Sequence, residues 1–233
     1  MNIRNAVAFI TGANRGLGLA LVRELQAQGA RKIYAGVRDV ASIDLPGVIA
    51  VQLDVTDDAQ VAAAAAQCGD VDLLINNAGI ARLAGSLDAD AVDIARDLFD
   101  ANVLGIVRMS RAFAPILAGN GGGALVNILS VGSWINGPAL SLYAATKSAA
   151  WGITNGLRAA LAEQRTLVTG VHVGFMDTDM TKGLDFAKVT PASVAVQIVA
   201  AVADGKEEVL ADDITVAVKQ GLSAGVYLKP LER

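Results

Sequence analysis

A tyrosine and a lysine lie four residues apart, at Tyr143 and Lys147. Residues with this spacing share one face of a helix, so the two side chains would be neighbours. A free tyrosine has a pKa of about 10, but a neighbouring ammonium group favours the phenolate and lowers that pKa. The pair therefore predicts an acid/base centre. The alternative for this common spacing is a half-buried tyrosine beside a surface lysine.

Three glycines, Gly12, Gly16 and Gly18, follow the apolar run 7–11 and precede a helix-like segment at 19–25. Gly12 can turn the chain with a positive φ, Gly16 lets the backbone approach a pyrophosphate, and Gly18 lets the helix pack closely on a sheet. The free N–H groups of the helix would then face the phosphates. The context of strand, turn and helix favours dinucleotide binding over an ordinary turn.

The end of the second expected strand should show which dinucleotide binds, because an acidic side chain there would hold the ribose 2′-hydroxyl of NAD. Arg38 comes first after the apolar run, and Asp39 follows it. Arg38 and Arg15 could together bind a 2′-phosphate bidentately, which favours NADP(H) over NAD(H). A small register shift would make Asp39 the ribose ligand and favour NAD. Both arginines could also be solvated loop residues.

These residues must be positioned by a scaffold, and short β-rich runs alternate with longer segments of helical spacing along the chain. Strands are expected at 7–11, 32–37, 48–53, 73–76, 124–128, 167–173 and 208–210. Helices are expected at 16–28, 57–67, 89–118, 141–164, 191–204 and 214–220. The alternation predicts an α/β fold: one doubly wound Rossmann-type domain over 1–233, with a parallel sheet of about seven strands and helices on both faces.

Composition narrows the possible partners and location. The chain has 233 residues, 53% of them hydrophobic, yet no apolar stretch reaches the roughly 18–20 residues that span a bilayer. We therefore expect a cytoplasmic protein without a membrane contact. The net charge of −4 and the lack of a basic run argue against a nucleic-acid partner. Cys68 and His172 are the only residues of their kinds, which predicts packing roles and no metal.

Several motifs occur in one order: the glycine loop, residues 76–79 with the sequence Asn-Asn-Ala-Gly, Ser130, and the Tyr143/Lys147 pair thirteen residues later. Asp54 and Val55 follow the third expected strand, and Asn102 lies in the long expected helix. Together they closely resemble the short-chain dehydrogenase/reductase family over about residues 7–180. The resemblance implies an NADP-dependent oxidoreductase, a carbonyl reductase or alcohol dehydrogenase.

The family pattern implies a role for each of these residues. Ser130 would orient the substrate carbonyl, Tyr143 would be the general acid/base, and Lys147 would hold the nicotinamide ribose and lower the tyrosine pKa. Asn102 would hold a water in the proton relay, or it is a polar kink in the helix. The implied cofactor-binding residues are Gly12, Asn14, Arg15, Gly16, Leu17, Gly18, Arg38, Asp54, Val55, Asn76, Ala78, Gly79, Tyr143, Lys147 and Thr178.

The segment after the sixth expected strand departs from the family pattern, because Val173 replaces the usual proline, while Thr178 stands where a nicotinamide-binding threonine is expected. Loops around the site are rich in apolar residues, so we expect a mainly apolar pocket for a ketone or aldehyde. Core packing is an equally good use for some of them. The predicted pocket residues are Trp134, Ile135, Leu140, Phe175 and Met176.

Other functions remain open at this point. A non-catalytic dinucleotide-sensing regulator would need no Ser130, Tyr143 and Lys147 together, and neither would a methyltransferase. A 3-oxoacyl thioester reductase would show basic residues near the site, for which Arg82, Arg108 and Arg111 are candidates. Small residues on the helix that holds Tyr143 allow close helix approach, so a homodimer or homotetramer is expected; they are Ala144, Ala145, Ser148, Ala149 and Gly152.

Overall fold

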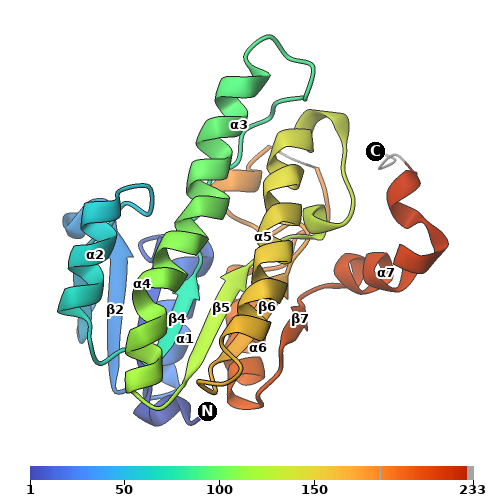
Figure 1. The fold of residues 1–233 in the computed structure, drawn as a ribbon. Coiled ribbons are helices and arrows are strands. Elements are labelled where there is room, and N and C mark those ends of the chain that lie inside the picture. Colours follow the sequence, from blue (N-terminus) through green and yellow to red (C-terminus); the bar gives the residue numbers. More distant parts are fainter. Residues whose placement is uncertain (184, 230–233) are drawn as a thin grey trace.

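A seven-stranded parallel sheet forms the centre of the computed structural model, which describes residues 1–183 and 185–229 (Figure 1). The strand order is β3-β2-β1-β4-β5-β6-β7. The strands are β1 (Val7–Thr11), β2 (Lys32–Val37), β3 (Val48–Gln52), β4 (Leu73–Asn76), β5 (Ala124–Ile128), β6 (Leu167–His172) and β7 (Glu208–Leu210). Five of them have the predicted bounds, and β3 and β6 end one residue earlier than predicted. The predicted single doubly wound fold is confirmed.

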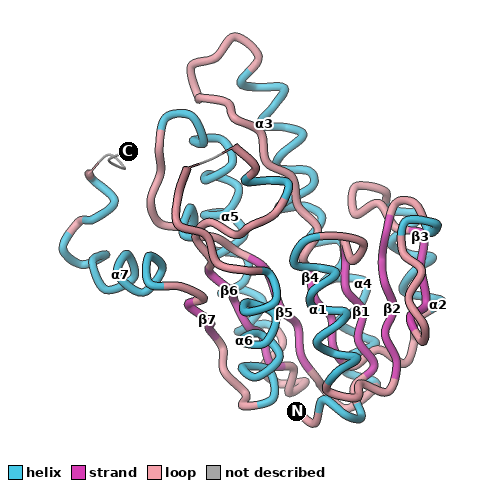
Figure 2. The backbone as a smooth tube through the Cα atoms, turned by 180° about the vertical axis from the view of Figure 1, so that it is seen from behind, coloured by secondary structure: helices cyan, strands magenta, loops and turns pink. Residues whose placement is uncertain are grey.

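Helices cover both faces of the sheet, with α2, α4 and α5 on one face and α1 and α6 on the other (Figures 1 and 2). The side chains of β1 show why: Ala8 and Ile10 pack with α1 and α6, whereas Val7 and Phe9 pack with α2 and α4. A strand buried on both sides is apolar throughout. The helices are α1 (Gly16–Ala27), α2 (Asp58–Gln67), α3 (Ala91–Phe99), α4 (Gly105–Gly119), α5 (Ser141–Ala160), α6 (Pro191–Ala203) and α7 (Asp213–Gly221).

The long helix predicted at 89–118 is interrupted in the structure. A π-helical turn, Asp100–Leu104, joins α3 to α4 and contains Asn102. By length and composition the run Ala91–Gly119 could cross a membrane. It packs against α2 and α5, however, and it bears six charged side chains: Asp93, Arg96, Asp97, Asp100, Arg108 and Arg111. We therefore describe it as a core helix of the α/β layer.

The strand order reverses between β1 and β4, which are neighbours in the sheet. From β1 the chain builds outward to β2 and β3, then returns to start the other half with β4. In open parallel sheets such a reversal leaves a crevice at the carboxyl ends of the strands, where ligands bind. The loops after β1, β4, β5 and β6 therefore bring residues from distant parts of the chain to one edge.

The tight packing at Gly18 yields the first prediction. A Cβ at Gly18 would lie 2.1 Å from the carbonyl oxygen of Gly12 and 2.7 Å from Nδ2 of Asn77. We expect Gly18→Ala to lower the free energy of unfolding by roughly 1–3 kcal/mol, because the backbone must move to admit the methyl group. Gly156→Ala is the matched control: a Cβ there, in α5, meets nothing within 4 Å. It should raise that free energy by about 0.5–1 kcal/mol. Urea unfolding measures the free energy of unfolding of both variants. Equal changes in the two variants would contradict the close packing at Gly18.

Candidate active site

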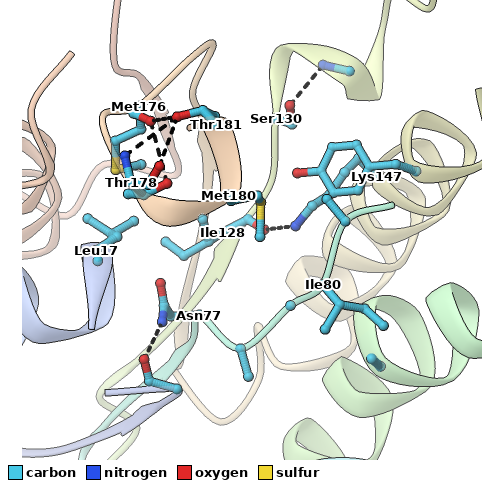
Figure 3. Close-up of a pocket in the computed structure, with 18 of the residues that line it drawn as sticks. Leu17, Asn77, Ile80, Ile128, Ser130, Lys147, Met176, Thr178, Met180 and Thr181 are labelled. Carbon is cyan, nitrogen blue, oxygen red and sulfur yellow. Dashed lines mark hydrogen bonds between the residues drawn. The ribbon is translucent and has the colours of Figure 1, made fainter. Parts of the chain in front are cut away.

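A cleft of about 1310 Å³ lies at the carboxyl edge of the sheet. It exceeds the roughly 300–1,000 Å³ of an ordinary small-molecule pocket, so it can hold a dinucleotide together with a substrate. Figure 3 shows Leu17 and Asn77 on one side of the cleft and Ser130 and Lys147 on the other. The predicted site residues that line it are Gly12, Asn14, Arg15, Gly16, Leu17, Arg38, Asp54, Val55, Ala78, Gly79, Ser130, Ile135, Leu140, Tyr143, Lys147, Phe175, Met176 and Thr178.

The glycine loop has the geometry of a phosphate-binding turn. Gly12 and Gly16 adopt φ values of +65° and +53°, which side chains rarely adopt. Asn77 fixes this loop to the end of β4, because its Nδ2 donates to the carbonyl oxygens of Thr11 and Gly12 at 2.9 and 3.1 Å. Helix α1 starts at Gly16, and its capping residue Arg15 makes no side-chain hydrogen bond to the first turn. The first N–H groups of α1 are thus left for a phosphate.

At the other end of the cleft, Asp39 is engaged in a local structure. Its side chain accepts a hydrogen bond from the N–H of Ala41 at 3.0 Å and caps the short 3₁₀ turn Val40–Ser42. Arg38, directly before it, lines the cleft. Arg15 also lines the cleft and forms an exposed ion pair with Asp179, at 3.1 Å. Asp39 lines the cleft as both arginines do, and one of its carboxylate oxygens is used as the cap.

Ser130, Tyr143 and Lys147 all line the cleft and lie close to one another. Ser130 follows β5, and the other two lie in the first turns of α5. The buried Lys147 Nζ donates to the carbonyl oxygen of Ile128 at 2.8 Å and lies 5.7 Å from the centroid of the Tyr143 ring. Ser130 Oγ accepts from the N–H of Gly132 at 3.0 Å, so its own proton can be donated elsewhere.

The pKa of Tyr143 differs from the prediction. The sequence predicted that Lys147 lowers it, but burial raises the pKa of Tyr143 to about 12, and hydrogen bonding to Ser130 offsets only part of this. Burial also lowers the pKa of Lys147 to about 8, because its ammonium is removed from water. The ammonium donates to Ile128 rather than to the phenol, so desolvation dominates. At pH 7 Tyr143 is therefore a neutral phenol, a form suited to donating a proton.

The side chain of Asn102 lies behind the cleft and is fully engaged. Its Oδ1 accepts from the N–H of Ile80 at 2.8 Å, and its Nδ2 donates to the carbonyl oxygen of Ile80 at 2.9 Å and to Thr146 Oγ1 at 3.1 Å. Thr146 Oγ1 donates in turn to the carbonyl oxygen of Tyr143 at 2.6 Å. Asn102 thus connects the loop after β4 to α5. Because both polar atoms of its side chain already form hydrogen bonds, a water in the proton relay would have to bind the main chain of Asn102.

Besides Asn102, three predicted residues do not line the cleft. Gly18 is buried in the first turn of α1, and Asn76, the last residue of β4, donates to Asn127 at 2.9 Å within the core. Successive strand residues face opposite sides, so Asn77 reaches the glycine loop instead. Trp134 is also buried and stacks on His172, with ring centroids 3.8 Å apart.

The sequence argument missed further residues of the cleft, among them two apolar side chains from the C-terminal part of the chain. Phe186 lines the cleft and stacks on Phe175 with ring centroids 4.1 Å apart, and Ile214 reaches it from α7. Phe186 lies shortly after Thr178 and Ile214 lies in α7, and neither belongs to a recognised motif. Only the apolar character of these positions could have indicated them.

Comparison with known proteins settles the family. A family model described as short chain dehydrogenase matches residues 6–188. The chain belongs to the short-chain dehydrogenase family. Galactitol 2-dehydrogenase (L-tagatose-forming) of Cereibacter sphaeroides is 37% identical over 187 residues, which cover 76% of this chain and 73% of that protein.

Two further comparisons concern the cofactor and the type of relative. A short-chain dehydrogenase from Burkholderia cenocepacia, solved in complex with NADP, is 39% identical with a TM-score of 0.92, over 97% of this chain and 95% of that one. The 3-oxoacyl-acyl-carrier-protein reductase of Vibrio harveyi is 30% identical over 194 residues, covering 79% of each chain. This short-chain dehydrogenase is therefore an enzyme of a family that uses a nicotinamide cofactor.

The buried charge of Lys147 yields a stability prediction. The pKa of Lys147 is 10.5 in the unfolded chain and about 8 in the folded protein. Below pH 8 both states carry the proton, but the folded state binds it more weakly, so the charge destabilises the fold. We expect Lys147→Met to raise the free energy of unfolding at pH 7 by roughly 1–3 kcal/mol, and this gain should shrink as the pH rises from 8 towards 10.5.

The matched control is Lys206→Met, which removes an exposed lysine paired with Asp204 at 3.3 Å. Exposed pairs contribute little, so its effect should stay within about 0.5 kcal/mol. Denaturant unfolding at pH 7 and pH 10 gives both values. A loss of stability in Lys147→Met at pH 7 would contradict the cost assigned to the buried charge.

Proposed function

We propose that this short-chain dehydrogenase reduces ketones or aldehydes with NADPH and oxidises the corresponding alcohols in reverse. The convergence of Ser130, Tyr143 and Lys147 in one cleft supports this most directly. A carbonyl group placed there would meet a serine hydroxyl, a neutral phenol and a buried ammonium group. A cofactor-sensing regulator would need none of the three.

The cleft fits a dinucleotide, because the glycine loop offers backbone N–H groups and positive φ values on the side away from Ser130. When bound, NADPH supplies the hydride for the carbonyl carbon. Ser130 Oγ donates a hydrogen bond to the carbonyl oxygen and orients it. Tyr143 donates its proton to that oxygen as negative charge develops there.

Lys147 acts through its charge. With a pKa of about 8 it is cationic at pH 7, and it lies beside the Tyr143 ring, where it stabilises the phenolate left after proton transfer. It also holds the nicotinamide ribose in this proposal. Since the phenol is neutral at pH 7, reduction is the favoured direction there, and oxidation becomes faster at higher pH, where phenolate forms more readily.

The preference for NADP rests on Arg38 and Arg15. Both line the cleft, and Asp39, which also lines it, has one carboxylate oxygen used as a turn cap. The pairing of Arg15 with Asp179 is exposed, so a 2′-phosphate can compete for it at little cost. The NADP complex of the Burkholderia cenocepacia relative supports the same choice.

The substrate end of the cleft supports an apolar carbonyl compound. Ile135, Leu140, Phe175 and Met176 line it as proposed from the sequence, and Phe186 extends the apolar surface. Trp134 does not line the pocket, because it is buried and stacks on His172. An apolar pocket favours ketones or aldehydes with hydrophobic substituents.

The basic residues give a 3-oxoacyl thioester reductase only partial support. Arg82 pairs with Asp97 at 3.1 Å, and Arg108 pairs with Asp100 at 2.7 Å and Asp58 at 3.4 Å. Arg108 is therefore largely neutralised, whereas the Arg82 pair is exposed and Arg111 forms no ion pair among the described residues, so these two could still meet an acidic carrier protein. Carbonyl reduction of a free small molecule remains the better-supported reaction.

Removal of the phenol hydroxyl tests the proposed reaction. We expect Tyr143→Phe to lower kcat at least about 100-fold, because the general acid is lost. NADPH affinity and thermal stability should change little. Tyr227→Phe, the same change at a side chain 56% exposed near the end of the described chain, is the control and should keep full turnover. Near wild-type turnover in Tyr143→Phe would disprove the assigned role.

The cofactor preference has its own test. We expect NADPH to bind more tightly than NADH, and Arg38→Leu to weaken NADPH binding about 10–100-fold while NADH binding changes little. Arg23→Leu, on the exposed face of α1, is the control. Fluorescence titration yields the dissociation constants. Equal affinities of the wild type for NADH and NADPH would contradict the preference.

A further inference from the structure

We propose that His172 is a positioning residue that fixes the catalytic serine, Ser130, through a hydrogen bond to its carbonyl oxygen and a stack on Trp134. This inference rests on the proposed function for its kinetic consequence. His172 ends β6, the strand beside β5, and it is fully buried behind the cleft. Its Nδ1 lies 3.2 Å from the carbonyl oxygen of Ser130.

The hydrogen bond defines the tautomer of His172. A carbonyl oxygen can only accept, so Nδ1 must bear the proton. Burial lowers the pKa of His172 to about 4, so the ring is neutral at pH 7 and Nε2 has no proton. This agrees with the surroundings of Nε2, which has no hydrogen-bond partner among residues 1–183 and 185–229. A neutral imidazole usually varies between its tautomers, whereas this site selects one.

The charged groups around His172 act on its ring in opposite directions, and burial outweighs them. The carboxylate of Glu208 lies 3.8 Å from Nε2 and is paired with Lys219, which also lies over the Trp134 ring at 5.4 Å from its centroid. Lys219 and Lys147 both disfavour a positive charge on the imidazole, and Glu208 favours one. Desolvation outweighs the Glu208 carboxylate, so the neutral ring persists.

Trp134 holds the imidazole in place. The two rings are stacked at 3.8 Å between centroids with 20° between their planes, and Trp151 meets the indole edge-on at 6.0 Å. Trp134 directly follows the 3₁₀ turn Val131–Ser133, which starts just after Ser130. The stack therefore joins the turn after Ser130 to the end of the neighbouring strand.

These contacts matter because they determine the orientation of Ser130. Its carbonyl oxygen accepts from Ser133 N–H at 2.9 Å as well as from His172, and its Oγ accepts from Gly132 N–H. Without the imidazole donor this carbonyl oxygen would lose one of its two partners, and a shift of the Ser130 backbone would move Oγ relative to Tyr143. A misplacement of about 1 Å in a catalytic group can cost about 100-fold in rate.

The tautomer can be measured without any substrate. His172 is the sole histidine of the chain, so labelling with ¹⁵N-histidine gives signals from one imidazole in the tag-free protein. We expect at pH 7 a neutral ring with a protonated Nδ1 and an unprotonated Nε2. A proton on Nε2, or a cationic ring, would overturn the inference whatever the enzyme's activity.

Kinetics then separates positioning from packing. His172→Asn keeps a donor close to the position of Nδ1, whereas His172→Leu fills similar space without one. We expect His172→Leu to lower kcat about 10–100-fold with the NADPH dissociation constant unchanged, and His172→Asn to stay within about 3-fold of the wild type. Both variants should lose similar thermal stability, because both lose the stack on Trp134.

The outcomes distinguish this inference from the proposed function. An active wild type with equal kcat values in both variants overturns the positioning role alone. A wild type that turns over no carbonyl compound refutes the proposed function, and the NMR result still decides whether His172 donates to Ser130.

Discussion

The buried ammonium group of Lys147 is the constraint on which the rest of the site depends. Its hydrogen bond to the carbonyl oxygen of Ile128 joins the start of α5 to the end of β5. Tyr143 lies one turn earlier on the same helix, and Ser130 follows Ile128 by two residues, so this contact places both. An apolar side chain would be the more stable choice at such a depth, so the retained charge indicates a function.

A polar network behind the cleft supports this contact. Asn102, held in the π-helical turn, bonds to both polar groups of the Ile80 backbone and to Thr146, which bonds to the carbonyl oxygen of Tyr143. Asn77 connects the same loop to the glycine turn. Satisfied networks of this kind rigidify their surroundings. The two halves of the cleft, one lined by the glycine loop and the other by Ser130, Tyr143 and Lys147, are thus parts of one connected structure.

The sequence predicted much of the fold because parallel strands buried on both faces are continuous apolar runs, as in β1. It also placed Ser130, Tyr143, Lys147 and the glycine loop in one cleft. It missed the raised pKa of Tyr143, since spacing shows that an ammonium is near but not how much water both groups lose. It put Trp134 in the pocket because nothing local shows which way a residue after a 3₁₀ turn points.

The central claim is that hydride from NADPH and a proton from Tyr143 reach one carbonyl group in this cleft. The most direct measurement supplies NADPH with deuterium at the transferred position, together with a panel of apolar ketones and aldehydes in ordinary water. The account predicts an alcohol with one deuterium at its carbinol carbon. An alcohol without deuterium, or no consumption of NADPH with any member of the panel, would contradict it.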